Sequence, residues 1–255
     1  MELFDSHCHV DFHHFDEDRD ELFQRMQSEG ITRIMAVAVE LEQAPRLIHL
    51  SEQYDGVWFS VGVHPNHEVI SEPTVEQICE LAQHHRCMAI GETGMDFFRH
   101  HVDPAIQEER FRTHIRAAHL LHKPVIVHMR DADEATLRIL KEENIAACGG
   151  IMHCFSSSWE AASQALEMGM SISFSGNVTF KNSHDLRDVA ALVPEDALLI
   201  ETDSPYLAPV PMRGKRNDPT LVKHVAQCIA DVRQTSLHHI ARISTHNGCH
   251  TFGIS

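Results

Sequence analysis

A short apolar segment followed by a helical one recurs eight times along this sequence, and this alternation restricts the chain to few folds. The expected strands are residues 3–9, 31–39, 57–63, 87–90, 124–127, 150–152, 171–174 and 197–200. The expected helices are residues 16–30, 43–54, 74–84, 104–122, 132–143, 158–169, 186–192, 219–232 and 237–244. The strands are nearly continuous in apolar residues, which is typical of a parallel sheet covered by helices on both faces.

Eight such units predict an α/β protein with the (β/α)8 TIM-barrel fold, in which residues 1–255 form a single domain. An open, doubly wound sheet is the alternative, although no Gly-x-Gly-x-x-Gly motif follows the first strand. Residues 205–217 contain Pro209, Pro211 and Gly214, so they are expected to form a loop of this domain rather than a linker. The sequence therefore favours the closed barrel.

Charge and cysteine content narrow the functional classes. The formal net charge of −16 argues against coating of nucleic acid or an anionic membrane by bulk electrostatics. A phosphate substrate stays possible, because carboxylates can hold cations that supply positive charge locally. The seven cysteines are scattered without a Cys-x-x-Cys pair, which is typical of reduced thiols in a cytoplasmic protein. No signal-like segment and no run of about 18 apolar residues is present, so no membrane association is expected.

Polar residues gather at the C-terminal ends of the expected strands, where barrel enzymes carry their chemistry. The first strand supplies His7 and His9, which an extended backbone places on one face with Asp5. The ends of later strands supply His64, Glu92, His128, His153 and Asp203. Four of these histidines and two carboxylates at one barrel mouth are suited to two divalent metal ions with a carboxylate between them.

Other polar residues are expected around this centre. Asp203 is the candidate acceptor of a proton from water, and Glu201 and Asp5 either orient the ligands or have a structural role. His64 is expected to contact the substrate or line the mouth, and residues 177–182 to add an amide contact. The cationic donors available for a phosphate are Arg130, Arg213, Lys215 and Arg216. The alternative for the last three is an ordinary solvated loop.

The strand ends also carry a set of motifs in a fixed order. They are Asp5-Ser-His-Cys-His9, Gly62-Val-His-Pro65, Gly91-Glu-Thr-Gly-Met-Asp96, His128-Met-Arg-Asp-Ala132, His153-Cys-Phe155 and Glu201-Thr-Asp-Ser-Pro-Tyr-Leu-Ala-Pro209. From Asp5 to about Asn217 the set resembles the TatD-type metal-dependent hydrolases and deoxyribonucleases, nearest to their YcfH-like branch. The resemblance implies a two-metal TIM-barrel phosphodiesterase that acts on DNA ends, with single-stranded ends as the expected substrate.

The resemblance also implies roles for individual residues. His7, His9 and Asp203 would hold one metal, His128 and His153 the other, and Glu92 would bridge the two. Asp203 and Glu92 are then the expected catalytic residues. The expected substrate contacts, which follow from residue type and position rather than from the resemblance, are His64, Arg130, Arg213 and Arg216. The metals could be zinc, manganese or magnesium, although the histidines disfavour an all-magnesium site. No protein partner is implied.

One departure from the family pattern lies after the His-Cys-Phe motif. The family usually has Ser/Thr-Gly there, whereas this chain reads Ser156-Ser157-Ser158. Loss of the glycine restricts the backbone, which puts the substrate range in question more than metal binding.

Two other functions stay open at this point. One is a metal-dependent hydrolase that cleaves a non-nucleic-acid ester, amide or lactone on the same barrel, for which no basic loop is needed. The other is a non-catalytic binding protein, for which the complete ligand set would have no purpose.

Overall fold

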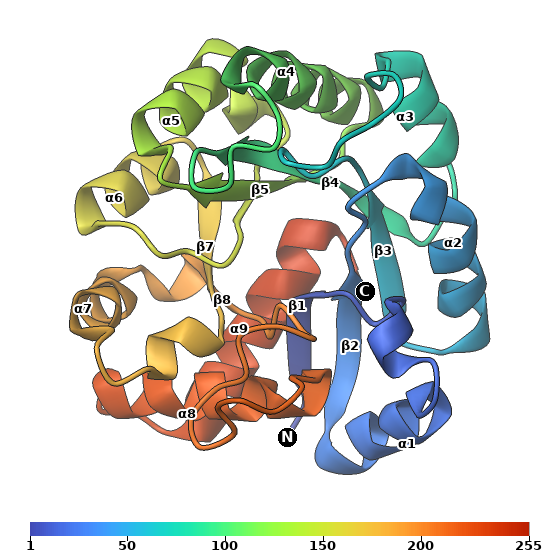
Figure 1. Ribbon diagram of the computed structural model, residues 1–255. Coiled ribbons are helices and arrows are strands. Elements are labelled where there is room, and N and C mark those ends of the chain that lie inside the picture. Colours follow the sequence, from blue (N-terminus) through green and yellow to red (C-terminus); the bar gives the residue numbers. More distant parts are fainter. Residues whose placement is uncertain (255) are drawn as a thin grey trace.

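Eight parallel strands pair in chain order and form the ring seen in Figure 1. In this computed structural model, which describes residues 1–254, they are β1 (Leu3–Cys8), β2 (Ile31–Ala36), β3 (Val57–Val61), β4 (Cys87–Asp96), β5 (Val125–Arg130), β6 (Gly150–Met152), β7 (Met170–Phe174) and β8 (Leu198–Ile200). At the C-terminal ends of β1 and β8, the amide of Asp203 donates to the carbonyl of His7 (2.9 Å), and the amide of His9 donates to the carbonyl of Ser204 (2.8 Å). These bonds bring the first and last strands together, so the predicted (β/α)8 barrel is confirmed.

Most of the helices lie around the outside of the ring, and the last one crosses its centre in the view of Figure 1. The helices are α1 (Arg19–Glu29), α2 (Ala44–Gln53), α3 (Val75–Leu81), α4 (Pro104–Leu121), α5 (Asp133–Glu142), α6 (Trp159–Glu167), α7 (His184–Leu192), α8 (Val222–Val232) and α9 (Leu237–Phe252). Short 3-10 turns lie at His13–Phe15, Leu41–Gln43, Ile145–Ala147, Gly176–Thr179, Glu195–Ala197 and Pro219–Leu221. Within residues 1–254, no helix has both the length and the apolar character needed to cross a bilayer.

Local sequence sets several helix ends. Gly30 adopts a left-handed conformation (φ +83°) that ends α1, as glycine after a helix commonly does. The α3 helix begins at a capping box, in which Thr74 accepts from the amide of Gln77 and the Gln77 side chain accepts from the amide of Thr74. The last helix continues to Phe252, eight residues past its predicted end at residue 244.

The core has two layers. The larger layer packs between the strands and the outer helices, and a smaller one fills the inside of the ring. The inner layer consists of Phe4, Met35, Val37, Ala89, Ile126, Ile151, Leu199, Phe252 and Ile254. Phe252 and Ile254 show that the C-terminal segment packs against the barrel interior, and Gly248 of α9 leaves space for the ring of Phe4.

Two strands extend further than the apolar pattern predicts. The β4 strand was expected to end at residue 90 but runs to Asp96, and β5 was expected to end at residue 127 but runs to Arg130. Gly94 pairs with His128 and Asp96 with Arg130, so the two polar motifs form a continuation of the sheet. Glu92 and His128 are therefore held by paired backbone rather than by loops, which fixes their position.

Candidate metal centre

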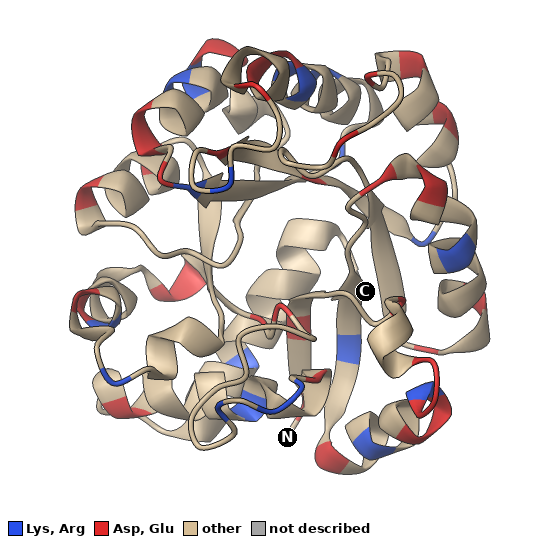
Figure 2. Cartoon of the chain, in the orientation of Figure 1, with Lys and Arg blue, Asp and Glu red and all other residues tan. Residues whose placement is uncertain are grey.

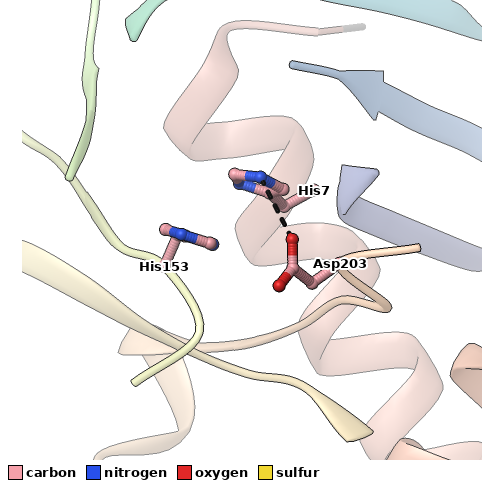
Figure 3. A group of neighbouring side chains, drawn as sticks. All are labelled: His7, His153 and Asp203. Atoms are coloured by element: carbon pink, nitrogen blue, oxygen red, sulfur yellow. Dashed lines mark ion pairs between the residues drawn. The ribbon is translucent and has the colours of Figure 1, made fainter. Parts of the chain in front are cut away.

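The six predicted ligands come together at the C-terminal end of the barrel strands. Five of them line a cavity of about 730 Å³, namely His9, Glu92, His128, His153 and Asp203. His7 is completely buried against this group. Figure 3 shows His7, His153 and Asp203 turned toward one another, although they come from three different strand ends.

One set of donor atoms lies on the β1 side of the site. The Nε2 atoms of His7 and His9 are 3.7 Å and 3.5 Å from Oδ1 of Asp203. The same two nitrogens are 3.0 Å and 3.7 Å from Oε2 of Glu92. Two imidazole nitrogens and two carboxylate oxygens therefore face a common point.

A second set lies on the β5 and β6 side. Nδ1 of His128 and Nε2 of His153 are 3.3 Å apart. They are 3.1 Å and 3.5 Å from Oε1 of Glu92, which is the other oxygen of the carboxylate that faces His7 and His9. Glu92 is thus placed between the two sets, with one oxygen directed to each.

The residues present fit a divalent cation. Oε2 of Glu92 is buried and has no hydrogen-bond partner among residues 1–254, although two imidazole nitrogens approach it. A buried carboxylate oxygen left in this state is costly unless a cation or a donor satisfies it. Mixed imidazole and carboxylate donors are typical ligands of zinc and similar divalent ions.

Groups behind the histidines fix the orientation of their rings. Nδ1 of His9 is 2.9 Å from the carbonyl of Val37, and a proton there leaves Nε2 free as a ligand. Nδ1 of His153 is 3.1 Å from Oε1 of the fully buried Glu201, which also accepts from the amide of Cys154. Glu201 therefore orients a histidine, one of the two roles expected from the sequence.

Asp96 performs the equivalent task for His128, and the sequence reasoning assigned it no role. Its Oδ2 is 3.2 Å from Nε2 of His128, while its Oδ1 accepts from the amides of Phe98 and Arg99. The sequence does contain a signal for this role, because Asp96 lies four residues after Glu92 and therefore on the same face of an extended strand.

Asp5 has a structural role, which is one of the two roles expected from the sequence, although it does not bond to an imidazole. Its carboxylate accepts from the backbone and the hydroxyl of Thr202, at 2.8 Å and 2.5 Å, and from the backbone of His7 rather than from an imidazole. The pairing of β1 with β2 shifts register between Asp5 and Cys8, which breaks the strict alternation that would align Asp5 with the two histidines. Asp5 instead ties β1 to the segment that carries Asp203.

We expect the Glu201→Gln substitution to weaken metal binding about 10- to 100-fold, the usual cost of changing a group that orients a ligating histidine. The amide retains the shape of the side chain but removes the negative charge beside Nδ1 of His153. Competition titration against a chelator measures the effect. Glu195→Gln is the matched control, because Glu195 also contacts a histidine (His239, 2.9 Å) but lies exposed on the surface. Equal affinities for the two variants would contradict the assigned role.

The electrostatics of the site couple the histidines to the carboxylates. Burial alone would raise the pKa of Glu92, but His153, His128 and His7 lower it well below its usual range. Burial likewise disfavours the charged form of His9, yet Asp203 and Glu92 raise the pKa of His9 to about 9. The pKa of His153 is raised well above its usual value against burial, because Glu92 and Glu201 face it.

These shifts predict that metal binding releases protons. Below about pH 9 the metal-free form of His9 carries a proton, and a ligating nitrogen must lose it. Metal affinity is therefore expected to increase as the pH rises toward 9 and to level off above it. Calorimetric titrations in buffers of different ionisation enthalpy count the protons released. A metal affinity that does not change between pH 6 and pH 9 would contradict this prediction.

The predicted substrate contacts divide into two groups. His64 and Arg130 line the cavity, as does Asn177 from the segment expected to supply an amide. Arg213 and Arg216 are not among its lining residues. The guanidinium of Arg213 stacks on Phe180 at 3.7 Å, and that of Arg216 pairs with Asp18 and donates to the carbonyl of His14.

Several lining residues were not identified from the sequence. They are Asn66, Asp96, Phe98, Arg99 and Tyr206. All lie on or just after the quoted motifs, at the ends of β3, β4 and β8 or in the loops that follow. Their nearness to the motifs was the only available signal, since their residue types are common in solvated loops.

The loop after His153 accommodates Ser157 without a glycine conformation. Ser157 is not among the residues of positive φ in the described chain, and its hydroxyl donates to the carboxylate of Asp133 at the start of α5. The serine therefore anchors this loop, and its backbone does not need the freedom of glycine.

The fold and the donor set together define a metal-dependent hydrolase of the (β/α)8-barrel class. The family model described as "TatD related DNase" matches residues 4–253. The chain therefore belongs to the TatD family of metal-dependent hydrolases.

Individual relatives agree with this assignment. The uncharacterized metal-dependent hydrolase YcfH of Escherichia coli is 42% identical over 258 residues, covering 100% of this chain and 97% of the relative. The 3'-5' ssDNA/RNA exonuclease TatD of Cronobacter sakazakii is 30% identical over 237 residues, covering 91% of this chain and 90% of the relative. Among solved structures, the TatD homologue YjjV of Escherichia coli superposes with a TM-score of 0.92 at 27% identity, over 99% of this chain and 98% of that one.

Proposed function

We propose that the protein is a two-metal phosphodiesterase that degrades single-stranded DNA from an end. The observation that carries this proposal is the division of the donor atoms around Glu92, whose two oxygens face separate pairs of histidines at 3.0–3.7 Å. His7, His9, Glu92 and Asp203 would hold one cation, and Glu92, His128 and His153 the other. Two bound divalent cations supply Lewis acidity to a phosphoryl group and lower the pKa of water toward neutrality.

Asp203 is the proposed proton acceptor. Burial would raise the pKa of Asp203, but His9, His153 and His7 lower it, so the carboxylate is ionised at neutral pH. Its side chain is 15% exposed, whereas those of His7 and Glu92 are nearly inaccessible, so it can meet a water molecule from the cavity. Asp203 thus takes up the proton of the attacking water at a carboxylate oxygen.

His64 is the proposed hydrogen-bond donor to the substrate. Burial and the neighbouring His128 lower the pKa of His64 to about 3, so its imidazole is neutral. The amide of Asn66 donates to Nδ1 of His64 (3.0 Å), which places the remaining proton on Nε2. Nε2 lies beside Glu92 in the cavity and can donate to a phosphoryl oxygen without repelling bound cations.

Several features support a nucleic-acid substrate. Arg99 and Arg130 line the cavity and supply the cationic contacts that a phosphate requires. Figure 2 shows Lys and Arg on the loops after β4 and β8 as well as on the outer helices; the support comes from Arg99 and Arg130 at the cavity, because Arg216 pairs with Asp18 outside it. The exonuclease relative makes a DNA or RNA strand the natural first substrate to test.

All seven cysteines are free of disulfides, which fits a reducing cytosolic compartment.

The test uses end-labelled single-stranded DNA, duplex DNA and RNA, together with a panel of ester, amide and lactone substrates. With added Mn²⁺ or Zn²⁺, we expect progressive shortening of the single strand, and excess chelator should stop it. Hydrolysis of a small ester or lactone by protein that leaves every strand intact would overturn the nuclease proposal while preserving the metal-dependent hydrolase.

A further inference from the structure

Two large aromatic side chains are exposed at the cavity. Phe98 is 56% exposed and Tyr206 is 50% exposed, and both line the cavity that contains Glu92 and Asp203. They lie on the loops after β4 and β8, which are four strands apart in the ring of eight. The loops that carry the two residues lie on opposite sides of the ring of strands (Figure 1), so Phe98 and Tyr206 line the cavity from different walls.

Phe98 is held firmly although it is exposed. Its amide donates to Oδ1 of Asp96 (2.9 Å), and the other oxygen of that carboxylate faces Nε2 of His128. The guanidinium carbon of Arg130 lies 4.0 Å from the centroid of the Phe98 ring. The positive charge of Arg130 is attracted to one face of the ring, which stabilises the position of the ring. The other face stays available to a planar group.

Tyr206 is anchored in a similar way. Its amide donates to the carbonyl of Asp203 (3.0 Å), and its own carbonyl accepts from the side chain of Asn217 (2.6 Å). Phe12 and His14 contact the ring at 75° and 71°, so neither lies parallel to it. The tyrosine is thus a fixed ring three residues from the proposed proton acceptor.

We propose that Phe98, backed by Arg130, and Tyr206 are stacking surfaces for nucleobases on either side of the phosphodiester that is cut. This inference rests on the proposed function and adds a reason for its strand preference. Every base has a π-face, so stacking on aromatic rings grips a strand without reading its sequence. Bases stacked and paired in a duplex cannot receive these rings, so single strands are favoured over duplex ends. A site built only for a small ester or lactone would not need two fixed rings on different walls.

The experiment separates base contacts from phosphate contacts. It compares an oligothymidylate strand with a strand of the same length whose terminal positions lack bases. Binding is measured by fluorescence anisotropy in the Asp203→Asn background, which keeps the strands intact, and cleavage is measured in otherwise wild-type protein. The variants are Phe98→Ala and Tyr206→Ala, with Phe98→Tyr and Tyr206→Phe as variants that keep the ring. Leu192→Ala is the matched control, because Leu192 is 55% exposed on α7 and does not line the cavity.

Each alanine variant should bind and cleave the normal strand roughly 10- to 100-fold less well, the range that base–aromatic stacking spans. The same variants should bind and cleave the strand without terminal bases as well as wild type does. The variants that keep the ring should lose little binding or cleavage on either strand. Equal losses on both strands, or no loss on either, would overturn the stacking surfaces.

The two proposals fail in distinguishable ways. If wild-type protein cleaves neither strand but the alanine variants selectively weaken binding of the normal strand, the stacking surfaces stand and the nuclease is refuted. If wild-type protein cleaves both strands and the alanine variants match it on both, the nuclease stands and the stacking surfaces are refuted. If wild-type protein neither binds nor cleaves the strands, both are refuted.

Discussion

The Asp203→Asn enzyme is expected to hydrolyse phosphodiester substrate about 10²- to 10⁴-fold more slowly than wild type, the usual contribution of a positioned acid or base. The substituted asparagine would retain the size of the side chain and the backbone bonds that tie this segment to His7, but its amide cannot take up a proton. The loss should therefore appear mainly in kcat/KM. The midpoint temperature of thermal unfolding of the metal-free variant should stay close to that of metal-free wild type.

The control for this prediction is Asp185→Asn, which changes an exposed aspartate at the start of α7 in the same chemical way. It should have wild-type activity. If Asp203→Asn retains the nuclease activity of the preparation, the activity belongs to a contaminant or Asp203 is not the proton acceptor.

The Glu92→Gln protein is expected to lose affinity for divalent metals by more than about 100-fold, beyond the effect of altering a group behind a ligand. Glu92 directs one carboxylate oxygen to each set of histidines, Oε2 toward His7 and Oε1 toward His128. A glutamine would turn an NH2 group toward one set and would remove the negative charge that lies between four imidazoles. Metal content per chain, measured by mass spectrometry after dialysis, should fall from two toward zero, and hydrolysis should fall with it.

Glu134→Gln on α5 serves as the control, because Glu134 lies in the first turn of that helix and outside the cavity. Its metal content should match that of wild type. A Glu92→Gln protein that retains two tightly bound metals would show that another group joins the two sites.

The sequence predicted the barrel because its signal is periodic and repeated. Short apolar strands alternate with helices over the whole chain. The differences lie at element ends, as at β4, where buried polar residues continue the pairing to Asp96, and at α9, which continues to Phe252. The six residues predicted as ligands lie close together because the order of the strands places their C-terminal ends at one mouth of the barrel.

Side-chain pairing across the fold could not be predicted in the same way. The register shift in β1 that turns Asp5 toward Thr202 depends on the neighbouring strand and leaves no periodic trace. The bond between Asp96 and His128 and the pairing of Arg216 with Asp18 join residues 32 and 198 positions apart, respectively. Such contacts follow from tertiary packing and cannot be predicted from a local pattern. The sequence therefore predicts the basic loop at the cavity, whereas Arg216 of that loop pairs with Asp18 outside the cavity.

The most direct test of the central claim is anomalous scattering from crystals of the protein soaked in Mn²⁺ or Zn²⁺. Two peaks are expected, one among His7, His9 and Asp203 and one between His128 and His153, with the carboxylate of Glu92 between the peaks. A map with no peak in this cavity, or with a single peak that contacts only one set of histidines at saturating metal, would contradict the two-metal centre.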